Sequence, residues 1–83
     1  MIGHMSFDAE IVGYPNDDDA PPLWESLGHS TVAEAYVAAE AHVRASGSGD
    51  RCVLDVKTAH RWFILDRAGN RVATLTVTGD RCD

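Results

Sequence analysis

The chain has 83 residues, of which 45% are hydrophobic and 24% are charged, and its formal net charge is −6. This length allows one small domain, and the composition is typical of a folded globular protein rather than of a disordered chain. No apolar run is longer than five residues, which is far short of the about 20 needed to cross a bilayer.

The net charge is divided unevenly along the chain. Residues 1–50 carry nine acids and one arginine, a balance of −8, whereas residues 51–83 carry six basic residues and four acids, a balance of +2. An acidic total argues against nucleic acid as a partner, because phosphates attract clustered Lys and Arg. We expect the acidic half to meet a basic protein surface instead.

The first part of the chain predicts one strand and one loop. Residues 1–4 stand directly before a second methionine and are interpreted as a vector-derived remnant, which leaves a single domain over residues 5–83. Apolar and polar residues alternate over residues 6–14, the period of a half-buried strand. Three prolines and three aspartates fall within residues 15–22 and predict an acidic loop.

A helix is predicted over residues 30–46. Thr31 and Glu34 have the spacing of a capping box at its start, and Gly47 has the position of a C-terminal stop. One apolar stripe along this helix consists of Val32, Tyr36, Ala39 and Val43.

The C-terminal part predicts three strands. Alternation over residues 52–57 indicates the first of them, and two β-rich runs around the turn sequence DRAGN indicate a hairpin over residues 61–78. If Asp66 lies opposite Arg71, Trp62 pairs with Leu75 and Ile64 with Ala73. The predicted fold is α+β in the order β-α-β-β-β, a mostly antiparallel four-stranded sheet with one helix packed on one face.

The sequence WFIL is apolar on both faces of its strand, although one helix covers only one face of a sheet. The second face therefore needs a cover, which is either the segment at residues 21–24 or another protein chain. We expect self-association to a dimer, since exposed apolar patches commonly mark interfaces. The candidate interface residues are Trp24, Phe63, Leu65 and Val72.

The reactive residue types form no recognisable catalytic, metal or cofactor pattern. Cys52 and Cys82 are predicted at opposite ends of the sheet, which disfavours a disulfide and leaves Cys52 to fill the core. The histidines and cysteines lack metal-ligand spacing, and no nucleophile elbow or phosphate loop is present. Two cysteines also do not suit a secreted disulfide scaffold, so a cytoplasmic location is expected. We expect no enzyme and no cofactor.

Two hypotheses of function follow. The first is a non-catalytic protein interaction or regulatory module that self-associates through the second apolar face, or that binds a partner with a basic surface. The second is a nucleic-acid-binding module in which the hairpin supplies Trp62 and the candidate anion-binding residues Arg61, Arg67 and Arg71.

Overall fold

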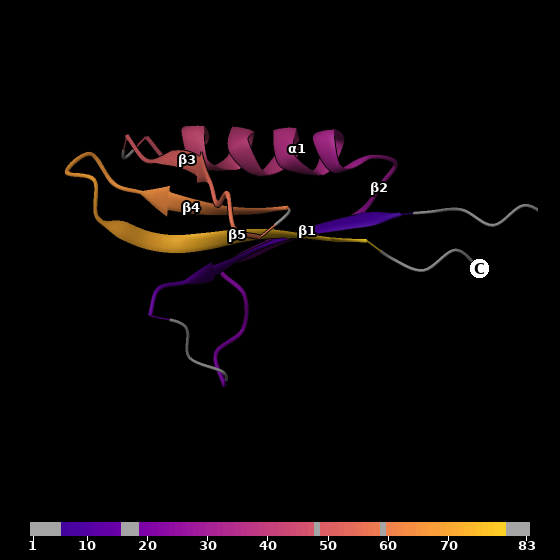
Figure 1. Cartoon of the computed structure of the whole chain (residues 1–83), viewed down its shortest axis with the longest axis horizontal. Helices are drawn as coiled ribbons and strands as arrows, with labels where there is room; N and C mark the ends of the chain where they lie inside the picture. The colour runs from indigo at the N-terminus through magenta and orange to yellow at the C-terminus, as the bar shows by residue number, and fades with distance from the viewer. Residues whose placement is uncertain (1–5, 16–18, 48, 59, 80–83) are drawn as a thin grey trace, which may run out of the picture.

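The computed structural model describes residues 6–15, 19–47, 49–58 and 60–79 (Figure 1). Within these residues the chain forms five strands and one helix. In chain order they are β1 (Phe7–Gly13), β2 (Trp24–His29), α1 (Val32–Ala45), β3 (Arg51–Leu54), β4 (Arg61–Leu65) and β5 (Arg71–Gly79).

The strands form one antiparallel sheet in the order β2-β1-β5-β4-β3. Helix α1 lies against one face of this sheet, and the loop between β1 and β2 extends away on the opposite side (Figure 1). The predicted α+β class and the single helix on one face are confirmed. Among the described residues, no helix is long and apolar enough to span a membrane.

The predicted number of four strands is wrong, because residues 24–29 form β2. This segment has little local signal for a strand, because it has no run of β-branched residues and contains Gly28. It becomes a strand by pairing with β1, where Trp24 lies opposite Ile11 and Ser26 opposite Ala9. Pairing with β1 thus forms a strand in a segment whose own β-propensity is weak.

Helix α1 begins and ends where the sequence predicts. The Thr31 hydroxyl accepts a hydrogen bond of 3.0 Å from the Glu34 backbone N–H, and Glu34 in turn accepts one from the Ser30 N–H. Gly47 adopts a φ of 72° after the last turn and donates its N–H to the Arg44 carbonyl. Backbone groups at both ends of the helix are therefore hydrogen-bonded by residues that are adjacent in sequence.

One apolar row crosses the whole sheet beneath the helix. Leu75 in the central strand is fully buried and pairs with Ile11 on one side and Trp62 on the other. The row consists, in spatial order, of Trp24, Ile11, Leu75, Trp62 and Leu54. Small helix residues, Ala35 and Ala39, are fully buried against this side of the sheet, so the helix packs closely on the row.

The β4–β5 hairpin has the predicted pairs but an irregular end. Trp62 lies opposite Leu75 and Ile64 opposite Ala73, as predicted. Arg71, however, pairs with Leu65 rather than with Asp66, because the register shifts there by one residue. Val72 is the extra residue, and this bulge changes which side of the sheet its side chain faces.

Strand β3 is shorter than the predicted run to residue 57. It ends at Leu54 because Asp55 starts a turn, in which its carboxylate accepts the Lys57 N–H and its carbonyl accepts the Thr58 N–H. Val56 consequently lies in the turn and is 89% exposed.

Candidate functional site

The sheet face opposite α1, called here the open face, is covered by no element in the part of the chain that the structure describes. Ala9, Ile11 and Leu75 belong to the core on the helix side. Since successive strand residues point to opposite faces, their neighbours in sequence lie on the open face. These include Glu10 and Val12 of β1 and Thr74, Thr76 and Thr78 of β5.

Arg71 lies between two aromatic rings on the open face. Its guanidinium carbon is 4.1 Å from the centre of the Tyr14 ring and 4.2 Å from that of Phe63. One guanidinium nitrogen, Nη2, donates a hydrogen bond of 2.7 Å to the Thr74 hydroxyl. Such stacking attracts the cation to the ring faces and fixes the plane of the guanidinium group.

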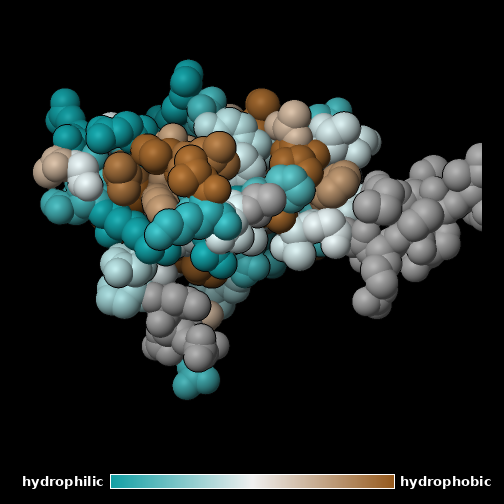
Figure 2. Space-filling view, viewed as in Figure 1, coloured by the Kyte–Doolittle hydropathy of each residue, from teal (hydrophilic) through white to brown (hydrophobic). Residues whose placement is uncertain are grey.

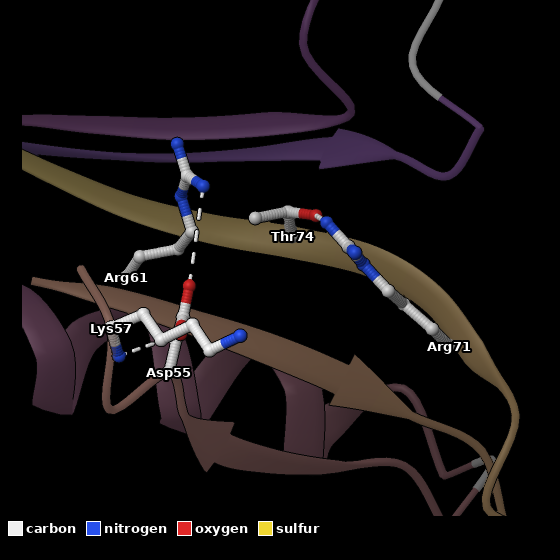
Figure 3. A network of polar contacts seen from close by, with 5 residues as sticks. All are labelled: Asp55, Lys57, Arg61, Arg71 and Thr74. Atoms are coloured by element: carbon white, nitrogen blue, oxygen red, sulfur yellow. Dashed lines mark hydrogen bonds and ion pairs between the residues drawn. The ribbon is translucent and has the colours of Figure 1, made fainter.

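Arg61 extends from β4 over the same face. Its Nη1 atom lies 4.0 Å from a carboxylate oxygen of Asp55, and the side chain is 43% exposed. The other Asp55 oxygen accepts the Lys57 N–H, so the turn after β3 fixes this carboxylate. Figure 3 shows Arg61 and Arg71 with Thr74 between them.

A hollow of about 300 Å³ lies between these side chains and the loop that follows β1. Arg61, Arg71, Thr74 and Thr76 supply its polar lining, and Val12, Tyr14 and Pro15 supply the rest. The Nε atoms of both arginines are buried and have no hydrogen-bond partner among the described residues. Unpaired buried donors of this kind are rare in proteins.

The four candidate interface residues lie on different sides of the sheet. Phe63 lies on the open face beneath Arg71, and Leu65, two residues on, shares that side by alternation. Trp24 instead stacks on His42 of the helix, with ring centres 4.9 Å apart. Because of the bulge, Val72 lines a helix-side cavity of about 240 Å³ together with Leu23 and Val43.

Of the two alternatives for the second face, cover by residues 21–24 is therefore wrong for Leu23 and Trp24. Both contact the helix side, Leu23 in the cavity and Trp24 on His42. Trp24 also pairs with Ile11 in the register of β1 and β2, and this pairing directs its ring toward the core.

Of the predicted anion-binding residues, the structure brings together Arg61 and Arg71 but not Arg67. The Arg67 side chain lies against the backbone of Gly49 and does not line the hollow. Trp62 points to the helix side, where its ring centre lies 4.7 Å from that of Tyr36.

Cys52 lies on the helix side, packed against the core as predicted. Burial raises the pKa of its thiol, and the nearby Glu40 carboxylate raises it further. At neutral pH the thiol is therefore protonated, which makes it a weak nucleophile. Cys82 lies outside the described residues, and within those residues no group of three or more Cys, His, Asp or Glu side chains could hold a metal ion.

A second exposed feature is apolar and lies at the β3 edge. Val53, Leu54 and Val56 are 40%, 53% and 89% exposed. Figure 2 shows hydrophobic surface gathered over β3 and β4 beside hydrophilic surface. Leu54 ends β3, and the turn at Asp55 separates it from Val56.

Comparisons of the chain with protein-family models, curated proteins and solved structures found no match. The residues predicted to bind an anion do not include Tyr14, Thr74 or Thr76, which line the hollow. Strand alternation places the two threonines on the face away from the helix, but no local pattern places Tyr14 beside Arg71.

Proposed function

We propose that the chain is a non-catalytic interaction module that self-associates by packing the open faces of two copies against each other. The observation that carries this proposal is the division of charge across the open face. Acidic residues lie on β1 and β2, basic residues on β3, β4 and the start of β5. The acidic side comprises Asp8, Glu10 and Glu25, and the basic side Arg51, Arg61 and Arg71.

The strand register makes this division self-complementary. Glu10 pairs with Thr76, and Thr76 pairs with Arg61, so the three residues form one row across β1, β5 and β4. A two-fold axis that runs along β5 sets Glu10 of one copy against Arg61 of the other, twice in each dimer. An in-plane axis perpendicular to the strands would set Glu10 against Glu10, which is repulsive.

The size of the face indicates a weak dimer. Five strands at about 4.8 Å spacing and about six residues of 3.3 Å rise give an area of about 500 Å² on each copy. Two such faces bury about 1,000 Å², near the lower limit for a specific interface. We therefore expect an association that depends on protein concentration and weakens with salt, because exposed charge pairs are screened.

The absence of catalysis is also part of the proposal, and the environment of Cys52 supports it. Its raised pKa keeps the thiol protonated, and its side chain packs against the helix side of the sheet rather than in the open-face hollow. The thiol is thus poorly suited to attack a substrate.

The test is the molar mass in solution, measured by sedimentation velocity over a concentration series. Reversal of one charge, by Glu10→Arg or by Arg61→Glu, is expected to shift the equilibrium toward the monomer. The double reversal restores the opposite charges in the row and is expected to regain most of the association. Val37→Arg changes the charge on an outward-facing helix position that is 61% exposed, and it is expected to leave the association unchanged.

A wild-type chain that remains monomeric throughout the series would refute self-association. A double reversal no better than either single variant would refute the two-fold axis along β5. Phe63 is less suitable as a test position, because a charge there would also disturb the stacked Arg71.

The nucleic-acid hypothesis has less support from the side-chain positions. Trp62 packs on Tyr36 and Arg67 lies apart from the other arginines, while Glu10 and Glu25 share the open face with them. A polarisation assay with labelled oligonucleotides across salt concentrations tests it, and steeply salt-dependent binding would support it.

A further inference from the structure

Counting only the residues that the structure describes, the hollow on the open face contains more positive charge than its neighbours neutralise. Among the described residues, Arg71 makes no ion pair, and Arg61 has only Asp55, at the long distance of 4.0 Å. Arg71 is surrounded by aromatic rings rather than carboxylates. Two guanidinium groups that face one hollow with a single distant acid favour an anion between them.

The hydroxyl groups of the hollow are arranged to donate. Because the Thr74 oxygen accepts a hydrogen bond from Arg71 Nη2, its own O–H is left for another acceptor. Thr76, in the same row as Arg61, presents a second hydroxyl to the hollow. Together with the guanidinium N–H groups, they form a set of donors without an acid of their own in the hollow's lining.

Arg71 is fixed before any ligand arrives. The Tyr14 and Phe63 rings both lie against its guanidinium group, and the hydrogen bond to Thr74 restrains the rotation of that group. A donor that is already ordered loses less conformational entropy when it binds. The buried Nε atoms of Arg61 and Arg71, which lack partners among the described residues, indicate further donor capacity at this point.

We propose that this hollow is a binding site for a phosphate group, held by Arg61, Arg71, Thr74 and Thr76. Its volume of about 300 Å³ exceeds that of a phosphate, so the rest of a phosphate monoester extends along the open face. Phosphate suits the donor set better than carboxylate does, because two guanidinium groups and two hydroxyls exceed what two carboxylate oxygens accept in good geometry. The site is complete within one chain and does not require a second copy.

The test uses inorganic phosphate and two-dimensional ¹H–¹⁵N NMR at constant ionic strength, with the full chain diluted until it is monomeric. Phosphate is expected to give saturable shifts at the amides of Val12, Thr74 and Thr76, and acetate to bind more weakly. Thr74→Val keeps the side-chain shape and removes the donor, and it is expected to weaken binding about tenfold. Thr78→Val is the matched control, since Thr78 lies on the same strand and does not line the hollow.

Several results would overturn the site. These are shifts that never saturate, equal affinity in Thr74→Val and in the control, or acetate binding as tightly as phosphate. Arg61→Gln provides a second variant at an exposed position and is expected to lose at least as much affinity as Thr74→Val.

Glu10→Gln separates this site from the proposed self-association. Glu10 does not line the hollow, so this variant should weaken association and keep phosphate binding. A wild-type chain that associates but shows no saturable shifts with phosphate would overturn the phosphate site alone.

Discussion

The two faces of this sheet are built from the same strands but differ in almost every physical property. On the helix side of β5, Ala73, Leu75 and Val77 are buried in one apolar core. On the open side, Thr74 and Thr76 alternate with them and line a hollow with two arginines. Because the period of a strand is two residues, one strand can carry a stabilising face and a binding face at the same time.

The difference between the faces separates the residues that stabilise the fold from those that we propose to take part in binding. The helix side gains its free energy from apolar burial, which is non-directional. The open side depends on directional contacts, such as the bond from Arg71 to Thr74 and the stacking of Arg71 on Tyr14. We expect substitutions on the helix side to change the free energy of unfolding and substitutions on the open side to change binding.

The largest expected effect is at Leu75, the only large side chain among the described residues that is fully buried. Leu75→Ala should lower the free energy of unfolding by about 2–5 kcal/mol, from lost burial and the cavity left behind. Thr76→Ala changes the next residue in sequence, which lies on the open face. Its free energy of unfolding should stay within about 0.5 kcal/mol of the wild-type value. Urea denaturation followed by circular dichroism measures both. Equal losses would mean that Thr76 contributes as much to packing as Leu75, so that the two faces would not differ in their part in stability.

A smaller effect is expected at the start of the helix that covers one face. Thr31→Ala removes the hydroxyl that accepts the Glu34 N–H and should cost about 1 kcal/mol of unfolding free energy. Thr78→Ala, on the open side of β5 and exposed, serves as the control and should have little effect. If both variants unfold at the wild-type urea concentration, the N-cap does not stabilise the helix.

The parts of the fold that sequence analysis predicted are those with local signals. Thr31 and Gly47 mark the ends of α1 within a few residues, and alternation around the DRAGN turn sets Trp62 opposite Leu75. Strand β2, which the sequence did not predict, has no such signal, because its formation depends on pairing with β1. The bulge at Val72 likewise follows from the geometry of the whole hairpin rather than from its composition.

The candidate site was predictable only in part for the same reason. Arg61 and Arg71 were named from their place on one basic hairpin. Tyr14 joins them from the end of β1, which is paired with β5 but distant in sequence. Long-range strand pairing determines which residues meet in the hollow, and a single sequence does not encode that pairing in any short pattern.

The smallest expected effect concerns Tyr36, whose ring packs against Trp62 on the helix side of the sheet. This effect is absent at neutral pH. Burial, followed by a hydrogen bond of 2.9 Å to Glu40, raises the pKa of Tyr36 from 10.0 to about 12. The folded chain therefore holds the phenol proton more tightly than the unfolded chain does. The stability from this difference is complete below pH 10 and is lost as the pH rises through about 12.

Tyr36→Phe removes this proton and its bond to Glu40 but keeps the ring packed against Trp62. The urea midpoint of the wild type should fall more steeply between about pH 10 and pH 12 than that of the variant. The two proteins share every other ionisable group, so the difference between the two curves isolates the phenol. Parallel curves would show that the Tyr36 hydroxyl is as accessible to water in the folded chain as in the unfolded one. In that case the helix side would be less completely closed than its apolar row indicates.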